Sequence, residues 1–500
     1  MSSINRFILK GGVVLVHDAE DRVQPLKTDI LVTGNKIEKI QKDIIPSGSE
    51  TIINCADKLI SPGFVDTHHH LWQTQLKGRH ANEVLLEYMV TGNWQSSNFN
   101  VADFYWGQLA GCLEALYNGT TTVVDHSHLN TSADASRAAI SATVSAGIRS
   151  IFGYCPTMKL KSWNPVEIDW NYLAPWVTET LEDLAAAAPF GDGRTHLGFA
   201  FDGYFLPKEV VVDLITKVKN LGIKTITSHA GVGAQFGNTH LPALLESYGI
   251  LDDTFLFSHL GGATKEDERL IIKANAHISS TPSTELQMGL GQLTCYREDL
   301  PELQNNCSLG IDCHSNNASS IVQEMRIGLQ QARGLYNQRF LDAGKAPASL
   351  PINRRVEAVF NLGTIQGARA IKMEDKVGSI AVGKLADLVI FDTQSPGMIC
   401  AAVHNPVAAI VLHSNSADIT DVIIDGKFRK RNGDLVGIQV EKDAVAIAQA
   451  DSLTWKDVAT RLIESRARLQ TVIDGLDFKD AKQKLMDLFH VDQSLIVDAL

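Results

Sequence analysis

Hydrophobic and polar residues follow two distinct patterns along this chain. Both ends contain short apolar runs separated by turn residues such as Gly34-Asn35, which is typical of β-strands. The runs lie at residues 7–16 and 28–32 near the start, and at 386–392, 408–412 and 421–426 near the end. We therefore expect residues 1–58 and 376–440 to pair into one small composite β-sandwich.

The segment between the two ends alternates apolar strands with amphipathic helices. Eight strands are expected at residues 60–65, 120–124, 149–153, 197–201, 224–227, 254–257, 276–280 and 308–311, with helices at 103–117, 133–146, 208–220 and 265–274. This alternation predicts an α/β fold, a (β/α)8 TIM barrel over residues 59–375. Residues 71–100 are too many for a simple connection and could form a lid. Residues 441–500 are expected to form a charged helical extension.

Composition narrows the functional classes. The 500 residues carry a formal net charge of −12 and no basic patch, so we expect no nucleic-acid partner. No apolar run reaches the roughly 18 residues of a membrane span, and the first residues lack the layout of a signal peptide. The seven cysteines are scattered and form no CxxC pair, which indicates reduced thiols in a cytoplasmic protein.

The motif with the clearest chemistry is Pro62-Gly-Phe-Val-Asp-Thr-His-His-His. His68 and His70 stand two residues apart at the end of an expected strand. Residues with this spacing point to the same side of extended backbone, so both imidazoles can reach one metal ion. A polar turn that happens to be rich in histidine is the alternative.

Three more residues of metal-binding types each follow an apolar strand directly: His229, His259 and Asp312. In a (β/α)8 barrel the carboxyl ends of the strands converge on one face, where active sites form. Any one of these residues alone could be an ordinary core residue. Their placement on separate strand ends, together with His68 and His70, predicts a metal centre.

This arrangement resembles the amidohydrolase superfamily, in particular its branch with cytosine deaminase and the triazine hydrolases. The resemblance covers nearly the whole chain, including the β-sandwich from both ends and the re-entry into it at residues 377–389. It implies that His68, His70, His229 and Asp312 hold one divalent metal ion, zinc or alternatively iron. It also implies that His259 contacts the substrate.

The chemistry of these residue types agrees with the implied site. A divalent ion lowers the pKa of a bound water to about 7. Asp312 can accept the proton of that water and pass it to the leaving group, and His259 can polarise the bond under attack. Asp66 could steady a ligand imidazole or cap its strand. No lysine follows the fourth strand, where Asp202-Gly-Tyr stands, so a carbamate-bridged pair of metals is not expected.

One departure from the family pattern concerns the proton donor. Deaminases of this branch usually carry His-x-x-Glu on the fifth strand, whereas this chain has Val232 after His229, and Gln235 nearby cannot shuttle a proton. A carboxyl group, Glu285, instead follows the seventh strand. We expect it to be a relocated acid/base or a partner for a cationic substrate group; a charge favoured at a helix start is the alternative.

Several other residues are candidates for substrate binding. His126 belongs to a His-Ser-His sequence after the second strand that imitates a metal pair, and we expect it to face the substrate. Trp72 and Gln73 follow the metal pair and could line the pocket or pack in the core. His314 is expected to enter the pocket. The neighbouring His69 is not expected to be a ligand, and Cys313 is expected in the core.

The leading functional prediction is hydrolysis of a non-peptide C–N bond, by deamination or by opening a cyclic amide or amidine, in a small heterocyclic or aromatic molecule. A metal-dependent dechlorinase or decarboxylase on the same barrel is the second possibility. A non-catalytic binding or assembly protein is the third. The expected partners are a small-molecule substrate, water and, in a homo-oligomer, further copies of the same chain.

Overall fold

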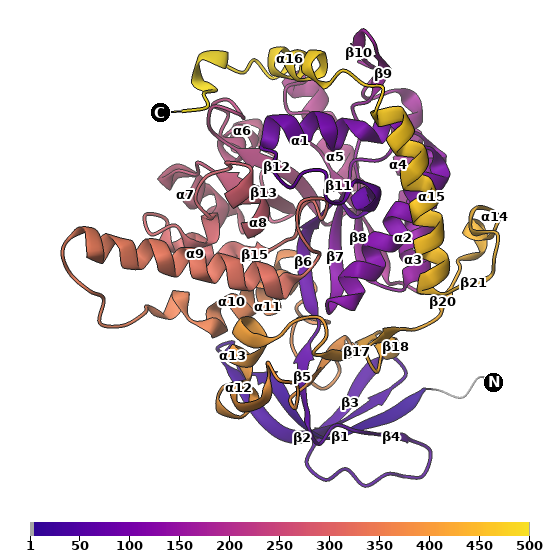
Figure 1. The fold of residues 1–500 in the computed structure, drawn as a ribbon, viewed down its shortest axis with the longest axis vertical. Coiled ribbons are helices and arrows are strands. Elements are labelled where there is room, and N and C mark those ends of the chain that lie inside the picture. The colour runs from indigo at the N-terminus through magenta and orange to yellow at the C-terminus, as the bar shows by residue number, and fades with distance from the viewer. Residues whose placement is uncertain (1–4, 500) are drawn as a thin grey trace.

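The computed structural model describes residues 5–499 and contains two large sheets (Figure 1). The first sheet is built from both ends of the chain, as predicted. Its order is β19-β18-β17-β16-β5-β1-β2-β3, with β4 paired to β1. Its strands are β1 (Arg6–His17), β2 (Val23–Thr33), β3 (Lys36–Gln41), β4 (Thr51–Asn54), β5 (Lys58–Pro62), β16 (Leu388–Asp392), β17 (Ile419–Ile424), β18 (Lys427–Arg431) and β19 (Asp434–Leu435).

The second sheet is the predicted parallel barrel, with strand order β15-β14-β13-β12-β11-β8-β7-β6. A parallel bridge between His69 and Asp312 and a hydrogen bond from the Ile311 N–H to the His68 carbonyl join its two ends. Its strands are β6 (Phe64–His69), β7 (Thr120–Ser127), β8 (Arg149–Tyr154), β11 (Thr195–Ala200), β12 (Ile226–Gly231), β13 (Phe255–Gly261), β14 (His277–Ser280) and β15 (Cys307–Leu309).

Helices follow the barrel strands and cover the outside of the barrel (Figure 1). The segments predicted at 133–146, 208–220 and 265–274 form helices with those bounds. The helices are α2 (Val101–Tyr117), α3 (Ala133–Ala146), α4 (Pro175–Ala187), α5 (Lys208–Asn220), α6 (Leu241–Tyr248), α7 (Lys265–Ala274), α8 (Pro282–Gln287), α9 (Ile321–Asp342), α10 (Val356–Leu362) and α11 (Ile365–Ala370).

Two predicted strands are wrong. The apolar run at 408–412 is helical, because it lies in α13 (Pro406–Ala408) and the π-helical turn η6 (Ala409–His413). The apolar run at 60–65 is divided between β5, which belongs to the first sheet, and β6, which opens the barrel. The chain passes from one sheet to the other at Gly63. A side chain at that position would collide with Thr121, because a Cβ atom there would lie 2.0 Å from its Oγ1.

The end of the barrel opposite the first sheet is covered by segments distant in sequence (Figure 1). Residues 71–100 form η1 (Leu71–Leu76), α1 (Leu85–Thr91) and η2 (Asn93–Asn98), and α16 (Phe478–Leu488) lies against α1. The hairpin β9 (Leu160–Trp163) and β10 (Val166–Ile168) and the long helix α15 (Trp455–Ile473) complete this part. Among residues 5–499, no helix combines the length and apolar character needed to cross a membrane.

The remaining segments are short. They are η3 (Thr294–Tyr296), η4 (Pro301–Asn306), η5 (Ile352–Arg354), α12 (Ile399–His404), α13 (Pro406–Ala408), the π-helical turn η6 (Ala409–His413), β20 (Ile438–Gln439), η7 (Lys442–Ala444), α14 (Val445–Ala448), β21 (Ser452–Leu453) and η8 (Gln493–Leu495).

Candidate metal centre

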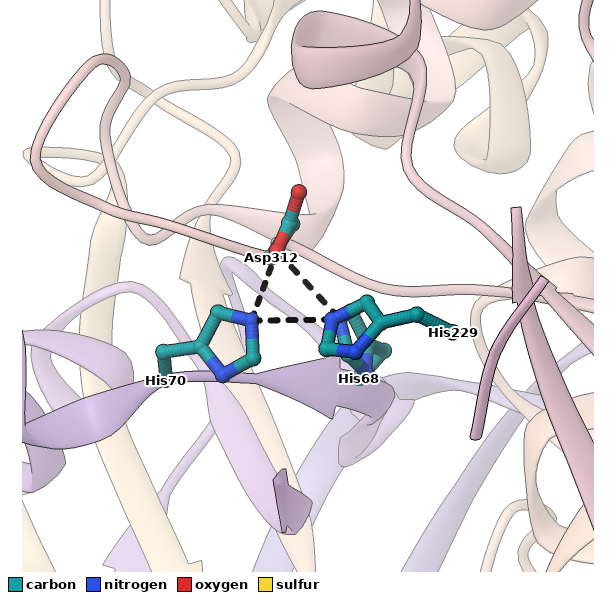
Figure 2. Close-up of side chains that lie close together, drawn as sticks. All are labelled: His68, His70, His229 and Asp312. Atoms are coloured by element: carbon teal, nitrogen blue, oxygen red, sulfur yellow. Dashed lines mark hydrogen bonds and ion pairs between the residues drawn. The ribbon is translucent and has the colours of Figure 1, made fainter. Parts of the chain in front are cut away.

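Four side chains converge at the carboxyl end of the barrel (Figure 2). His68 lies in β6, His70 follows it, His229 lies in β12 and Asp312 follows β15. One ligand atom from each lies within 4.8 Å of the others. Their side chains are buried except for that of His229, which is 24% exposed. The barrel therefore gathers the four residues that the sequence resemblance singled out.

The outer nitrogen of each of the three rings is occupied by a polar partner outside this cluster. The Nδ1 atoms lie 2.8 Å from Ser258 Oγ for His68, 2.7 Å from the His126 carbonyl oxygen for His70, and 2.9 Å from Asp202 Oδ2 for His229. Outer-sphere partners of this kind are typical of histidines that bind metals.

These contacts fix the protons of two rings. A carbonyl and a carboxylate can only accept, so His70 and His229 carry their protons on Nδ1 and turn Nε2 lone pairs toward each other, 3.3 Å apart. Asp312 Oδ1 lies 3.2 Å from His68 Nε2 and 3.0 Å from His70 Nε2. A tetrahedral ion with bonds of about 2.0–2.1 Å would hold its ligand atoms roughly 3.3–3.4 Å apart. The donor set and its spacing fit one divalent cation.

The charge states also suit a cation. Burial lowers the pKa of His68 and of His70, against the opposing effect of Asp312, so both rings are neutral at neutral pH. Burial alone would raise the pKa of Asp312, but its close contacts with these two rings hold it well below its usual range. Burial also acts to lower the pKa of His229, but the neighbouring Asp202 raises it. The cluster therefore combines two neutral imidazoles, those of His68 and His70, with an ionised carboxylate, in the charge states that metal ligands need.

Backbone strain accompanies the site. His259, Leu260 and Asp312 have positive φ angles of 71°, 53° and 66°. Residues other than glycine rarely adopt this region, at a cost of about 1–3 kcal/mol each, and such residues collect at functional sites. The left-handed residues near the end of β13 and after β15 thereby direct His259 and Asp312 toward the same point.

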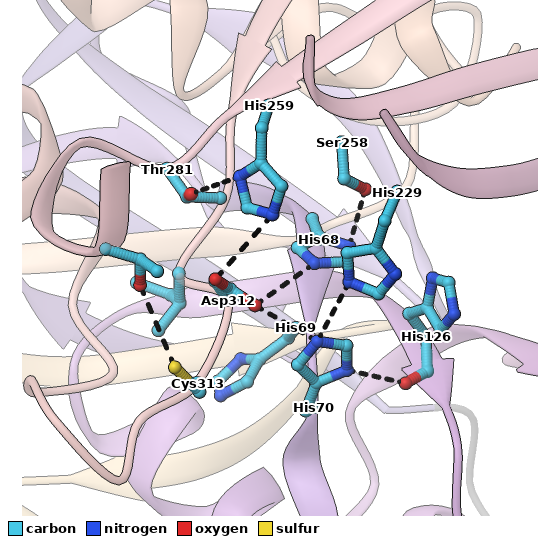
Figure 3. A network of polar contacts seen from close by, with 12 residues as sticks. His68, His69, His70, His126, His229, Ser258, His259, Thr281, Asp312 and Cys313 are labelled. Carbon is cyan, nitrogen blue, oxygen red and sulfur yellow. Dashed lines mark hydrogen bonds and ion pairs between the residues drawn. The ribbon is translucent and has the colours of Figure 1, made fainter. Parts of the chain in front are cut away.

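His259 stands beside Asp312 at the edge of the cluster (Figure 3). Its Nε2 lies 3.8 Å from Asp312 Oδ2, the carboxylate oxygen that does not face the other histidines. Its Nδ1 lies 2.9 Å from Thr281 Oγ1, and the ring is 4% exposed. Thr281 thus holds His259 with one nitrogen aimed at the free oxygen of Asp312.

Glu285 does not lie where a direct proton shuttle would have to be. Its Oε1 accepts the Thr281 N–H at 2.7 Å and its Oε2 accepts the Ser280 hydroxyl at 3.2 Å. The carboxylate is buried on the Nδ1 side of His259, 3.6 Å away, whereas Asp312 lies on the Nε2 side. These contacts agree best with the alternative interpretation, a charge at the start of a helix, here α8. The carboxylate also contacts His259.

Asp66 caps its strand, the alternative that the sequence left open, because its Oδ1 accepts the His68 N–H at 3.2 Å and the Ile311 N–H at 3.1 Å. Its Oδ2 binds Nδ1 of His69, which is not part of the metal cluster, at 2.7 Å. His69 Nε2 in turn lies 2.7 Å from His314 Nδ1, and His314 Nε2 lies 3.0 Å from Thr74 Oγ1. All four side chains are buried. The expectations that Asp66 holds a ligand imidazole and that His314 enters the pocket are therefore corrected.

Trp72 and Gln73 differ from the expectation as well. Trp72 is completely buried, with Phe99 and Phe104 edge-on to its ring, and its Nε1–H donates to His128 Nδ1 at 3.0 Å. Gln73 is equally buried and donates to the Tyr88 hydroxyl at 2.8 Å. Both residues pack in the core, the alternative that the sequence left open.

Asp202, after β11, is the residue that sequence reasoning missed. It accepts the backbone N–H of His229 at 2.8 Å and the ring N–H at 2.9 Å, and the fully buried His126 lies 3.2 Å away through Nε2. The sequence does contain a signal for Asp202, and it is the same one that identified His229. Each is a residue of a metal-binding type that directly follows an apolar run predicted to be a barrel strand.

Comparison with known proteins agrees with this geometry. The profile of the amidohydrolase family matches residues 59–196 and 216–429. A 5-methylthioadenosine/S-adenosylhomocysteine deaminase from Thermococcus sibiricus is 27% identical over 435 residues, which cover 84% of this chain and 93% of the relative. A 5′-deoxyadenosine deaminase from Methanobrevibacter smithii is 26% identical over 437 residues, covering 83% and 91%.

Solved structures show the same fold. An adenosine deaminase from Xanthomonas campestris with bound zinc superposes with a TM-score of 0.72 at 20% identity, covering 93% of this chain and 98% of that one. A mutant atrazine chlorohydrolase from Arthrobacter aurescens, complexed with zinc and atraton, has a TM-score of 0.73 at 19% identity, covering 93% and 100%.

Proposed function

Because the chain belongs to the amidohydrolase family, we propose that it hydrolyses a non-peptide C–N bond of a small heterocyclic molecule with the help of one divalent cation. The observation that carries this proposal is the convergence of His68, His70, His229 and Asp312, with their ligand atoms within 4.8 Å of one another. Structural neighbours that hold zinc support zinc as the ion, with iron as the alternative.

Bound at these four residues, the ion supplies Lewis acidity and makes a water molecule acidic enough to react near neutral pH. Asp312 uses its two oxygens differently. Oδ1 faces the ligand histidines, whereas Oδ2 is free to take the proton of the attacking water and return it to the leaving nitrogen. His259 holds its Nε2 beside that oxygen, where it orients the group under attack.

We propose deamination of a 6-aminopurine nucleoside or a related amino-heterocycle as the reaction. Water adds its oxygen to the ring carbon that carries the amino group, the C–N bond breaks, and ammonia leaves with the proton that Asp312 holds. The names of the relatives, deaminases of adenosine-type compounds, support this substrate class. The intact set of ligand residues argues for an enzyme over a binding protein.

Replacement of a chlorine atom on a similar ring is a second candidate, and Val232 favours it. Chloride leaves without a proton, whereas ammonia needs one. The absence of the usual glutamate after β12 should therefore slow dechlorination less than it slows deamination. Val232 is half-buried, and Gln235 donates to the Met288 and Gly289 carbonyls, so neither residue supplies an acid.

The two reactions are separated by their products. Zinc-loaded protein would be incubated with adenosine, 5′-deoxyadenosine, 5′-methylthioadenosine and chlorinated triazines, and ammonia and chloride would be measured. Ammonia release that His70→Ala abolishes supports the deaminase, and chloride release supports the second candidate. If neither ion appears from any compound, both reactions are excluded for these substrates.

We also propose that the chain acts in the cytoplasm as a homo-oligomer. Two large apolar side chains on α12, Ile399 and Val403, are 47% and 87% exposed, which supports a contact with another subunit. Light scattering after size-exclusion chromatography would test the oligomeric state. A mass of one chain at micromolar concentration would contradict it.

A further inference from the structure

We infer that Asp202 is a substrate-binding residue, and that it accepts a hydrogen bond from a hydroxyl or ammonium group of the substrate at the open edge of the metal centre. The inference rests on the proposed function, since it concerns the same pocket. It assigns a role to a carboxylate that the proposed chemistry does not use.

Asp202 is held rigidly. It follows β11 by two residues, it accepts two N–H groups of His229, and His126 Nε2 lies 3.2 Å from its Oδ2. The next residue, Gly203, passes so close to Phe201 and Tyr172 that a Cβ atom would lie 2.7 and 2.8 Å from their rings. The carboxylate therefore keeps one position and orientation, as a preorganised binding group must.

The same carboxylate is accessible to solvent. The side chain of Asp202 is 38% exposed, whereas those of Asp66, Glu285 and Asp312 are 0%, 3% and 5% exposed. An ionised carboxylate offers about four lone-pair sites. The two N–H groups of His229 and the contact with His126 leave it at least one further acceptor site. The imidazole ring of His229 lies between this carboxylate and the metal centre.

The surroundings favour an organic donor over a second metal ion. His126, Asp202 and His229 could in principle group around a cation. However, a second ion would have to displace the proton that His229 Nδ1 donates to Asp202, while its Nε2 already faces the first centre. Nearby aromatic rings suit an organic ligand: Phe205, 64% exposed, has its ring centroid 6.2 Å from that of Tyr172.

The test compares substrates that differ only in the donor group. Zinc-loaded wild type, Asp202→Asn and Asp202→Ala would be assayed with adenosine, with 2′,3′,5′-trideoxyadenosine, which lacks all the sugar hydroxyl donors, and with 3′-amino-3′-deoxyadenosine, which carries an ammonium group. The readout is the ratio of kcat/KM between two substrates in one preparation. This ratio does not depend on the fraction of enzyme that holds metal. A variant that binds less metal because His229 has lost its contact with Asp202 therefore still gives a valid ratio.

We expect the wild type to prefer one donor-bearing compound by about 10-fold or more, because hydrogen bonds to charged groups contribute that much. The ratio should fall toward one in Asp202→Ala and lie between in Asp202→Asn. The exposed Asp213 on α5 gives a matched control, Asp213→Asn, which should keep the wild-type ratio. Preference for the hydroxyl or for the ammonium compound identifies the donor.

Equal ratios in wild type and both variants would overturn the inference and leave the proposed function intact. Two zinc ions per wild-type chain, with one lost in Asp202→Asn, would overturn it too. If no compound is turned over, calorimetric titration of the zinc-loaded protein with the same three compounds decides. Tighter binding of a donor-bearing compound that is lost in the Asp202 variants would support the inference, although the proposed reaction would have failed. Equal binding of all three compounds would contradict both the inference and the proposed reaction.

Discussion

Asp312 turns one oxygen away from the metal ligands and toward His259. Its Oδ1 lies 3.0 Å from His70 Nε2, whereas its Oδ2 lies 3.8 Å from His259 Nε2. The left-handed backbone of both residues brings the two side chains together at the rim of the barrel. A single carboxylate can therefore hold a cation with one oxygen and a proton with the other.

Asp312→Asn is expected to lower kcat by roughly 10²-fold or more, because the amide cannot carry the proton of the attacking water. The amide oxygen can still face His68 and His70, so part of the metal should remain bound. Steady-state kinetics together with elemental analysis of the same sample checks both statements. Turnover near the wild-type value with full metal content would mean that another base accepts the proton.

His70→Ala is expected to remove the metal or weaken its binding severely. The substitution deletes an Nε2 atom that lies 3.0 Å from Asp312 and 3.3 Å from His229. Elemental analysis of protein purified without added metal should give one divalent ion per chain in the wild type and much less in the variant. His404→Ala, at an exposed position on α12, is the control. A folded, active wild-type protein without metal would refute the assignment.

Much of the barrel could be predicted because its signals are local. Helices such as α5 and α7 are set by their own apolar periodicity, and the metal ligands follow apolar strands whose ends converge in any parallel barrel. The break at Gly63 was missed because the apolar run continues through it. It depends on the close approach of Thr121, a residue of a neighbouring strand.

The depth of side chains and the contacts between loops could not be predicted in the same way. The spacing of His314 from Asp312 indicates proximity, but only the packed structure shows that His69 and Thr74 bind it below the site. Asp202 illustrates the same limit, because its role arises where the turn after β11 meets the strand β12. Sequence patterns describe one element at a time, whereas these contacts join several.

Acid is expected to destabilise the protein partly through His80. Burial lowers the pKa of this ring to about 4, from an ordinary 6.5, and its side chain is completely buried against Ser315. Between these values the unfolded chain binds a proton that the folded chain excludes. Stability is therefore lost as the pH falls from 6.5 through 4, by roughly 3 kcal/mol for this group.

His80→Asn should flatten this dependence, because the amide can keep a hydrogen bond to Ser315 but does not titrate. Scanning calorimetry between pH 4 and 7.5 would show a smaller fall of Tm in the variant than in the wild type. The exposed His404→Asn should follow the wild type. Parallel curves for wild type and His80→Asn would show that other groups cause the acid sensitivity.

Ser465→Ala is expected to loosen the link between the C-terminal helix α15 and the segment after His70. The Ser465 hydroxyl donates to Asp103 Oδ1 at 2.7 Å and accepts from Gln75 Nε2 at 3.0 Å, and both partners are buried. Gln75 Nε2 keeps its bond to the Asp103 carbonyl and Asp103 keeps its contact with Arg468, so we expect a loss near the lower end of the about 1–3 kcal/mol that an unpaired buried polar group costs. Chemical unfolding should show this loss, whereas Thr460→Ala, at an exposed position of the same helix, should change little. Equal stability of the two variants would exclude the link.

Glu285→Gln tests whether the carboxylate behind His259 acts through that ring. The amide oxygen can still accept the Thr281 N–H that Oε1 accepts at 2.7 Å, so α8 should keep its start. The negative charge 3.6 Å from His259 Nδ1 is removed, however. A positioning residue of this kind predicts a fall in kcat of about 10-fold and little change in metal content. KM should also change little, because the carboxylate is 3% exposed and does not face the pocket.

Glu285→Asp, which keeps the charge, should recover part of the lost rate, and this recovery separates a role of the charge from a role in packing. A rise in KM without a change in kcat would instead show that Glu285 reaches the substrate, contrary to the structure. If neither parameter changes in Glu285→Gln, the carboxylate only holds the start of α8. Asp312 would then have to hand its proton to the leaving group without help from the Glu285 charge, which is possible because its Oδ2 already faces the open side of the cluster beside His259.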